Sequence, residues 1–171
     1  SIAKTVASGG AYQNIHLSFQ EYFEKLGQDD VTWGKPFQSL LGALEVQKAF
    51  GLAAIGGKDS MSGTFEHLHV PPTLISFAFS KGDISTIISN AFVSSDSFLY
   101  LAKHHRKEHD MPNFEQLQTL YDDIHQMIKK RIILSAYALS TGGLSEAMMK
   151  ASFGNHISLS IQTDLSLFDL D

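Results

Sequence analysis

Apolar residues recur at every third or fourth position in three parts of the chain, which is the spacing of one face of an α-helix. They predict a helix over 37–50 that ends at Gly51, a helix over 114–131, and a shorter helix whose apolar face carries Leu144, Ala147, Met148 and Ala151. The first residues, Ile2–Ala7, predict the last turns of another helix, which Gly9 and Gly10 stop.

The remaining apolar segments are shorter and favour strands. The pattern predicts a buried strand over 73–79, a strand over 97–102, and a strand with one buried face over 157–161. Residues 15–19 fit either a short strand or the entry to a helix through Leu26, residues 27–36 a loop, and residues 84–92 a short helix or turn. Strands and helices do not alternate regularly, so we expect an α+β fold, with a domain boundary near Pro71 and Pro72.

Composition narrows the class of protein. The chain has 171 residues, of which 43% are hydrophobic, and a net charge of −5, with 13 basic and 18 acidic residues. This is enough apolar material for a core, and no basic excess indicates a nucleic-acid partner. Cysteine is absent, which excludes disulfides, thiol nucleophiles and cysteine-bound zinc. No apolar run approaches the roughly 20 residues that span a bilayer, so we expect no membrane partner.

The most unusual local composition lies at 56–64, where glycine and serine surround one lysine and one aspartate. Glycine permits a left-handed backbone, and successive N–H groups in a turn form an anion site. Lys58 would add a positive charge, and Asp59 would orient it or hold a magnesium ion. The spacing is not that of a Walker P-loop. The spacing alone favours the alternative, a plain glycine-rich turn with a solvated lysine and a capping aspartate.

A second glycine-rich turn, Ser140–Gly143, precedes the last predicted helix. A turn that leads into a helix presents free N–H groups and the positive end of the helix dipole, which suits a phosphate. The alternative is that Ser140 or Thr141 simply caps the helix.

Other patterns predict no chemistry. His67 and His69 are two residues apart, and His104, His105 and His109 share one polar segment. We expect solvated histidines, because zinc needs three or four converging ligands. Asp122 and Asp123 are adjacent on a predicted helix, so they point to different faces and are expected at the surface.

Taken together, these segments resemble the second synthetase half of the phosphoribosylformylglycinamidine synthase family. The resemblance rests on Gly57–Ser62 (GKDSMS), the strand Pro72–Ala78, the helix segment 120–124 and the turn Ser140–Leu144 (STGGL), in that order, and extends from Ile2 to about Leu165. The GKDSMS segment is the specific part. Both ends of the chain are expected to be cut within a longer protein.

The resemblance implies a function. The family is an ATP- and glutamine-dependent ligase of purine biosynthesis, which converts formylglycinamide ribonucleotide to formylglycinamidine ribonucleotide. Each synthetase half pairs two domains similar to those of aminoimidazole ribonucleotide synthetase. Residues 1–64 would be the end of the N-terminal type of domain, and residues 65–171 the first part of the C-terminal α+β type.

The resemblance also implies a site. Nucleotide phosphate would contact Gly57, Lys58, Asp59, Ser60 and Ser62 in the first segment and Ser140, Gly142 and Gly143 in the second. ATP or ADP would be the ligand, with magnesium, and Asp59 is the one weak candidate for a metal ligand. Two departures count against magnesium at the second segment, because Ala138 and Thr141 stand where the family carries aspartate, and Tyr137 where histidine is usual.

The implied partners are the rest of a cytoplasmic parent chain, including the catalytic synthetase half and the glutaminase domain. The fragment itself is then expected to be inactive, to hold an auxiliary or vestigial nucleotide site, and to self-associate through apolar surfaces left by its missing neighbours. Two alternatives remain open. One is another member of the superfamily, such as a selenophosphate synthetase or a thiamine-monophosphate kinase, and the other is a non-catalytic interaction module.

Overall fold

The computed structural model describes residues 1–168 as a mixture of helix (39%) and strand (17%), which agrees with the α+β prediction. The chain divides into two units. The first comprises Ser1 and Gln13–Ser80, and the second comprises Ile2–Tyr12 and the residues from Lys81 onward. The predicted division was 1–64 and 65–171. The structure divides the chain elsewhere because the strand after Pro72 pairs with a strand before Gly27.

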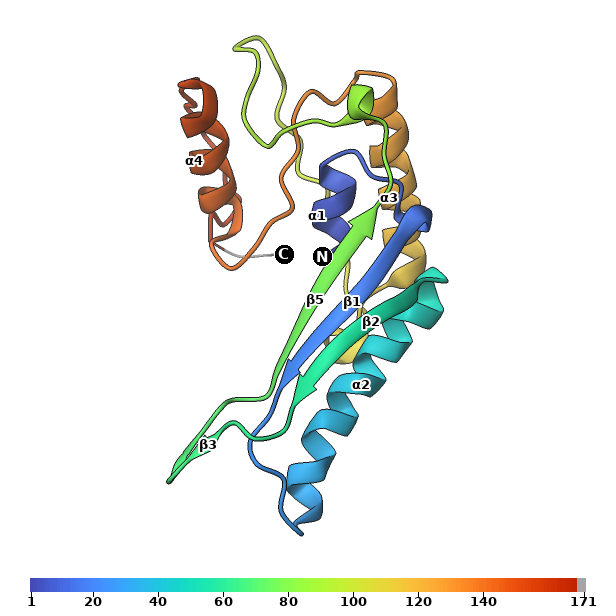
Figure 1. Cartoon of the computed structure of the whole chain (residues 1–171). Helices are drawn as coiled ribbons and strands as arrows, with labels where there is room; N and C mark the ends of the chain where they lie inside the picture. The colour runs from blue at the N-terminus through green and yellow to red at the C-terminus, as the bar shows by residue number, and fades with distance from the viewer. Residues whose placement is uncertain (169–171) are drawn as a thin grey trace. The chain divides into compact units, whose positions relative to one another are not determined.

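The first unit is a three-stranded sheet with one long helix (Figure 1). Its order is β2 (Ala53–Ser60), β1 (Ile15–Tyr22), β5 (Thr73–Ser80). β1 is parallel to β2 and antiparallel to β5. α2 (Asp30–Phe50) is the crossover between the two parallel strands, which cannot be joined by a tight turn. A small hairpin, β3 (Thr64–Phe65) and β4 (Leu68–His69), precedes β5.

α2 confirms the predicted helix over 37–50 and its end at Gly51, which has a left-handed φ of 66°. The prediction of a loop over 27–36 is wrong from Asp30 onward. Asp29 caps the helix by accepting a hydrogen bond from the Val31 N–H at 3.1 Å. Pro36, part of the predicted loop, lies inside the helix.

The core of the first unit lies on one face of β1. Ile15, Leu17 and Phe23 are each 1% exposed. The strand predicted over 73–79 is confirmed as β5, but it is not buried. Ile75, Phe77 and Phe79 alternate along it and are 38%, 45% and 54% exposed, so one face of the sheet is open.

The second unit is mainly helical. The predicted helices at its start and middle are confirmed as α1 (Ile2–Ala7) and α3 (Phe114–Lys129), which contact each other. Buried Val6 of α1 and Ile128 of α3 lie in this part of the core. The last predicted helix is α4 (Gly143–Asn155), and all four residues of its predicted apolar face are buried. Short 3₁₀ turns occupy Tyr12–Asn14, Ile84–Thr86 and Glu108–Asp110.

Two strand predictions in this unit are wrong. Residues 97–102 and 157–161 have apolar patterns, yet neither forms a strand. Phe98 and Tyr100 are 89% and 85% exposed, so the first segment buries neither of its aromatic side chains. An alternating pattern becomes a strand only where another strand supplies hydrogen bonds and a packed face.

Candidate functional site

The GKDSMS segment is mostly strand rather than turn, so the prediction of a glycine-rich turn there is wrong. Gly56, Gly57, Lys58, Asp59 and Ser60 belong to β2 and pair with Ser18 through Tyr22 of β1. Their backbone is extended, so successive N–H groups point in alternate directions and form no concave anion site.

Strand geometry separates the predicted side chains of this segment. Lys58 pairs with Gln20, and Asp59 pairs with Glu21. Because neighbouring side chains of a strand point to opposite faces, Lys58 and Ser60 share one face while Asp59 lies on the other. Ser62 follows the strand and is exposed. The predicted partnership between Lys58 and Asp59 therefore does not form.

Glu21 is a feature that sequence reasoning missed. It is 5% exposed, and its Oε1 has no hydrogen-bond partner. Burial, followed by the negative charge of Asp59, raises the pKa of the Glu21 carboxyl. The face that carries Asp59 is therefore acidic and disfavours a phosphate. In the sequence, only the alternation of Leu17, Phe19 and Glu21 with polar residues marked this position as inward-facing.

The second predicted segment does form a turn, and its donors converge. The Ser140 hydroxyl donates to Glu146 Oε2 at 2.5 Å, and the Gly142 N–H donates to the same oxygen at 3.2 Å. Gly142 is the N-cap of α4, so neither Ser140 nor Thr141 caps the helix as the alternative prediction held. Gly143 is buried, has a left-handed φ of 60°, and donates its N–H to the Ser140 carbonyl at 2.7 Å.

The turn therefore holds an anion, the carboxylate of Glu146 in the first turn of α4. Lys150 forms an ion pair with its other oxygen, Oε1. The hydrogen bonds from Lys150, Ser140 and Gly142 lower the pKa of Glu146 to about 2. Lys150 also lies 6.0 Å from the centre of the Tyr137 ring. We call this arrangement the cradle: the donors of Ser140 and Gly142 form a small oxyanion site, and the Glu146 carboxylate occupies its acceptor position.

Glycine is needed at position 142 for this fold-back. A Cβ atom there would lie 2.5 Å from Glu146 Cβ and 2.7 Å from Glu146 Oε2. The first glycine of the STGGL motif thus has a specific role, which is to let a carboxylate approach the backbone.

Neither segment offers a complete magnesium site. At the Ser140–Gly143 turn the nearby carboxylate is Glu146, which Lys150 already neutralises. At β2, the carboxylate that pairs with Asp59 across the strands is Glu21. Within residues 1–168, no three histidine, aspartate or glutamate side chains are grouped so that they could hold a metal ion. Magnesium binds oxygen ligands in octahedral geometry, so these donors do not fit it well.

Two of these histidines, His69 and His104, have local partners. His104 Nε2 accepts a hydrogen bond from the Asn113 N–H at 2.9 Å, and burial, with Arg106 and His105, lowers the pKa of His104. His69 Nδ1 lies 3.4 Å from Glu24 Oε2.

Comparisons with known proteins give no family assignment. No protein-family model matches the chain, and a search of curated proteins finds no significant match. Among residues 1–168, no helix has the length and apolar character needed to cross a membrane.

Proposed function

We propose that the chain is part of an ATP-dependent ligase of the phosphoribosylformylglycinamidine synthase type, and that its Ser140–Gly143 turn binds nucleotide phosphate. The observation that carries the phosphate site is the convergence of the Ser140 hydroxyl and the Gly142 N–H on one carboxylate oxygen. A phosphate oxygen presents the same acceptor to the same donors. The GKDSMS and STGGL motifs support the family on sequence.

In this proposal, Glu146 holds the cradle in shape when no ligand is bound. An incoming phosphate would displace the carboxylate from Ser140 and Gly142, and the partner of the released Glu146 would be Lys150. Gly143 would contribute through the positive end of α4. Because Glu146 competes with the ligand, we expect the site to bind nucleotide weakly. Weak binding agrees with an auxiliary or vestigial site.

For the first segment, the proposal keeps Lys58 and Ser60, which share a face, as phosphate contacts. Gly57 and Ser62 would assist from the backbone and the strand end. Asp59 would serve a magnesium ion only together with Glu21, because it lies on the opposite face from Lys58.

The proposed parent chain is cytoplasmic, and it acts with a catalytic synthetase half and a glutaminase domain. In this proposal, the domains of the present chain resemble those of aminoimidazole ribonucleotide synthetase.

The test is calorimetric titration of the 171-residue chain with ADP and ATP, with and without magnesium. We expect Ser140→Ala to weaken binding by roughly tenfold, the effect of one hydrogen bond to a charged group. Thr141→Ala is the matched control, because Thr141 is exposed in the same turn. Equal affinities for the wild type and Ser140→Ala would remove the phosphate site from the proposal.

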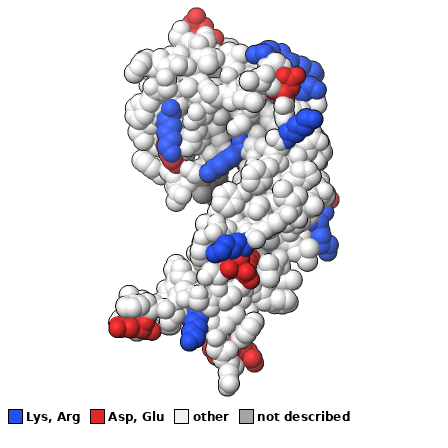
Figure 2. Space-filling view, viewed as in Figure 1, with Lys and Arg blue, Asp and Glu red and all other residues white. Residues whose placement is uncertain are grey.

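A second candidate function is that of a non-catalytic interaction module. It is favoured by the open face of β5, where Ile75, Phe77 and Phe79 remain 38–54% exposed. Most of the surface in the view of Figure 2 carries no charged side chain. A surface of this kind suits association with the parent chain or with a second copy. Concentration-dependent light scattering would test it, and a monomer at all concentrations would count against it.

A further inference from the structure

α2 carries a second apolar face in addition to the one that packs in the first unit, where it lies alongside the sheet (Figure 1). Its packed side holds Pro36, Ala43 and Phe50, which are buried. About a third of a turn around the helix, five large apolar side chains are between 44% and 63% exposed. We call them the α2 stripe, which consists of Trp33, Phe37, Leu40, Leu41 and Leu44.

The spacing of the α2 stripe is that of a helix-packing seam. Its members at positions 33, 37, 40 and 44 follow one another at intervals of four, three and four residues. This is the heptad spacing by which a helix packs against another helix. Single exposed apolar residues need no explanation, whereas a continuous apolar seam on one face indicates an interaction surface.

Trp33 is held in place at one end of this seam. Its indole N–H donates to the Gly27 carbonyl at 2.9 Å, so the polar group of the side chain is satisfied within the protein. The rest of the ring system is apolar and remains partly exposed. A tryptophan that is already ordered loses little freedom on association, which makes it an effective contact residue.

The two ends of the α2 stripe carry opposite charges. Asp30 lies beyond Trp33 at the N-terminal end, and Lys48 lies beyond Leu44 at the C-terminal end. Asp30 and Lys48 are eighteen residues apart, which is about five helical turns, so both lie on one side of α2. It is the side of the stripe, because Asp30 precedes Phe37 by seven residues, about two turns.

Lys48 is able to pair with a carboxylate outside its own helix. Its Nζ lies 3.9 Å from Glu45 Oε1, and both side chains are well exposed. An exposed pair at this distance contributes little, so it does not commit the lysine to Glu45.

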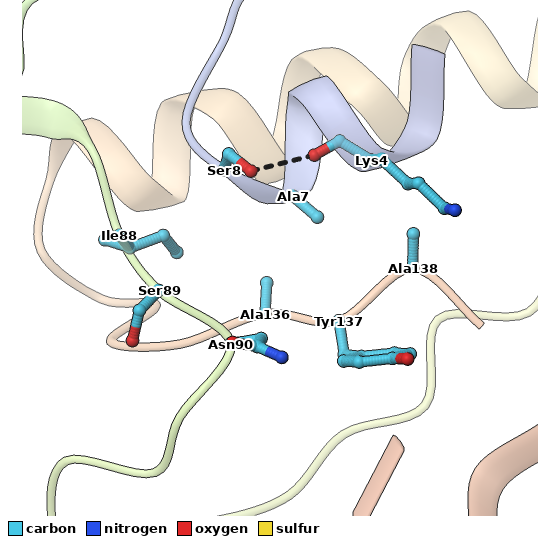
Figure 3. Close-up of a pocket in the computed structure, with 9 residues that line it drawn as sticks. All are labelled: Lys4, Ala7, Ser8, Ile88, Ser89, Asn90, Ala136, Tyr137 and Ala138. Carbon is cyan, nitrogen blue, oxygen red and sulfur yellow. Dashed lines mark hydrogen bonds between the residues drawn. The ribbon is translucent and has the colours of Figure 1, made fainter. Parts of the chain in front are cut away.

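The depression in the second unit offers no comparable surface. It lies between α1 and the segments 88–90 and 136–138. Figure 3 shows that the methyl groups of Ala136 and Ala138 point toward α1, while the Tyr137 ring points away from it. The lining side chains therefore do not meet at a common point, whereas those of the α2 stripe share one face.

We propose that two copies of the chain associate through the α2 stripe, with their α2 helices antiparallel and a two-fold axis at the middle of the stripe. The middle of the stripe and the middle of the span from Asp30 to Lys48 fall within one residue of each other. One antiparallel register therefore places Trp33 opposite Leu44 of the partner copy and Asp30 opposite Lys48 of the partner copy. A parallel pair would set like charges against each other at both ends.

The size of the α2 stripe sets the strength of this dimer. Five large side chains that are about half exposed would bury roughly 500 Å² on each copy and about 1,000 Å² in total. This is the lower limit for a specific interface, so we expect a reversible dimer with a micromolar Kd. The interface shares no residue with the Ser140–Gly143 turn or with the open face of β5, and it does not depend on the ligase proposal.

The experiment is sedimentation velocity of the 171-residue chain over a range of micromolar concentrations. We expect Leu40→Gln to weaken the dimer at least tenfold, because Leu40 lies next to the two-fold axis and both copies lose it. Phe98→Gln is the matched control, since Phe98 is an exposed apolar residue of the second unit, and it should leave the dimer unchanged.

Charge reversal tests the antiparallel register. Asp30→Lys and Lys48→Asp should each weaken the dimer by roughly tenfold, because the symmetry turns two attractive pairs into repulsive ones. The double variant, which carries both substitutions, restores opposite charges at both ends and should regain the affinity of the wild type. Circular dichroism checks that the variants are folded, which is expected because both positions are exposed.

The outcomes separate this interface from other contacts. Dissociation by Leu40→Gln, together with rescue in the double charge variant, supports it. An unchanged dimer in Leu40→Gln overturns it, and so does a dimer that Phe77→Gln disrupts instead, because the contact then lies on the open face of β5. Failure of the double variant to recover overturns the antiparallel register. A monomer at every concentration overturns the dimer and leaves the stripe to a segment of the proposed parent chain.

Discussion

The segments Gly56–Ser60 and Ser140–Gly143 have similar compositions and opposite structures. The first pairs along β1 as a strand, and the second turns into α4 and gathers donors around a carboxylate. The glycines explain the difference. Gly57 is needed because a Cβ atom would lie 2.6 Å from the Phe19 carbonyl oxygen of the neighbouring strand, whereas Gly142 is needed because Glu146 folds back onto it. A glycine in a motif thus indicates that another group lies close to the backbone. The surrounding structure determines whether that group is a neighbouring strand or an anion.

The largest effect is expected from Gly57→Ala. The added methyl group meets backbone rather than a movable side chain, so β1 and β2 must separate. We expect a loss of about 1–3 kcal/mol in the free energy of unfolding, the usual cost of overpacking. Urea denaturation measures it. Gly56→Ala is the control, since nothing lies within 4 Å of a Cβ atom there, and equal stabilities of the two variants would refute the strand account.

Each segment has one carboxylate beside it, buried in the first case and hydrogen-bonded in the second, and these extend the comparison. Substitution of the buried one, Glu21, is expected to have the next largest effect on stability. Its Oε1 lacks a partner, and its pKa is raised above 4.5 by burial and by Asp59. A raised pKa in the folded state means that the group favours folding while it is protonated, and that this contribution is lost as pH rises through the folded-state value. At pH 7 we therefore expect Glu21→Leu to stabilise the chain by about 1–3 kcal/mol, the cost of an unsatisfied buried polar group.

Measured across pH, the difference in unfolding free energy between wild type and Glu21→Leu should grow from acid to neutral. Asp59→Asn should lower the pKa of Glu21, because it removes the neighbouring negative charge. A stability difference that stays constant with pH would show that Glu21 does not carry the raised pKa.

Glu146 should behave in the opposite sense. Its pKa is lowered from 4.5 to about 2 by Lys150, Ser140 and Gly142. Its contribution to stability is present above pH 4.5 and is lost as pH falls through about 2. Carbon-detected NMR titration of the carboxyl group measures this, and Ser140→Ala should move the transition toward pH 4.5. An unchanged titration in that variant would mean that the hydroxyl does not hold the carboxylate.

The smallest effect is expected from Lys58→Ala. Lys58 is exposed on the edge strand and lies on the opposite face from Asp59, so its loss should change stability by less than about 0.5 kcal/mol. Its effect on ADP affinity should be smaller than that of Ser140→Ala. A larger effect would make the GKDSMS strand, rather than the turn, the main phosphate contact.

The sequence predicted local features well and long-range ones poorly. Helical spacing located α3 and α4, and Gly51 marked the end of α2, because side-chain periodicity and left-handed glycine act within a few residues. Strands depend on distant partners. Residues 97–102 have a strand-like pattern but do not form a strand, while the glycine-rich residues 56–60 form one because β1 pairs with them.

The candidate site shows the same limit. Ser140, Gly142 and Gly143 were found from the sequence, since a glycine-rich turn before a helix is a local signal. Glu146, which occupies the cradle, was not found, although it lies only four residues after Gly142.

The most direct test of the central claim is to remove the negative charge of Glu146 and titrate the chain with ADP. If the Ser140–Gly143 turn is a phosphate cradle that Glu146 occupies, Glu146→Gln should bind ADP more tightly than the wild type, while Ser140→Ala binds it more weakly. Equal or weaker binding by Glu146→Gln would contradict the account, because the carboxylate would then be a structural cap and not a competitor for the ligand.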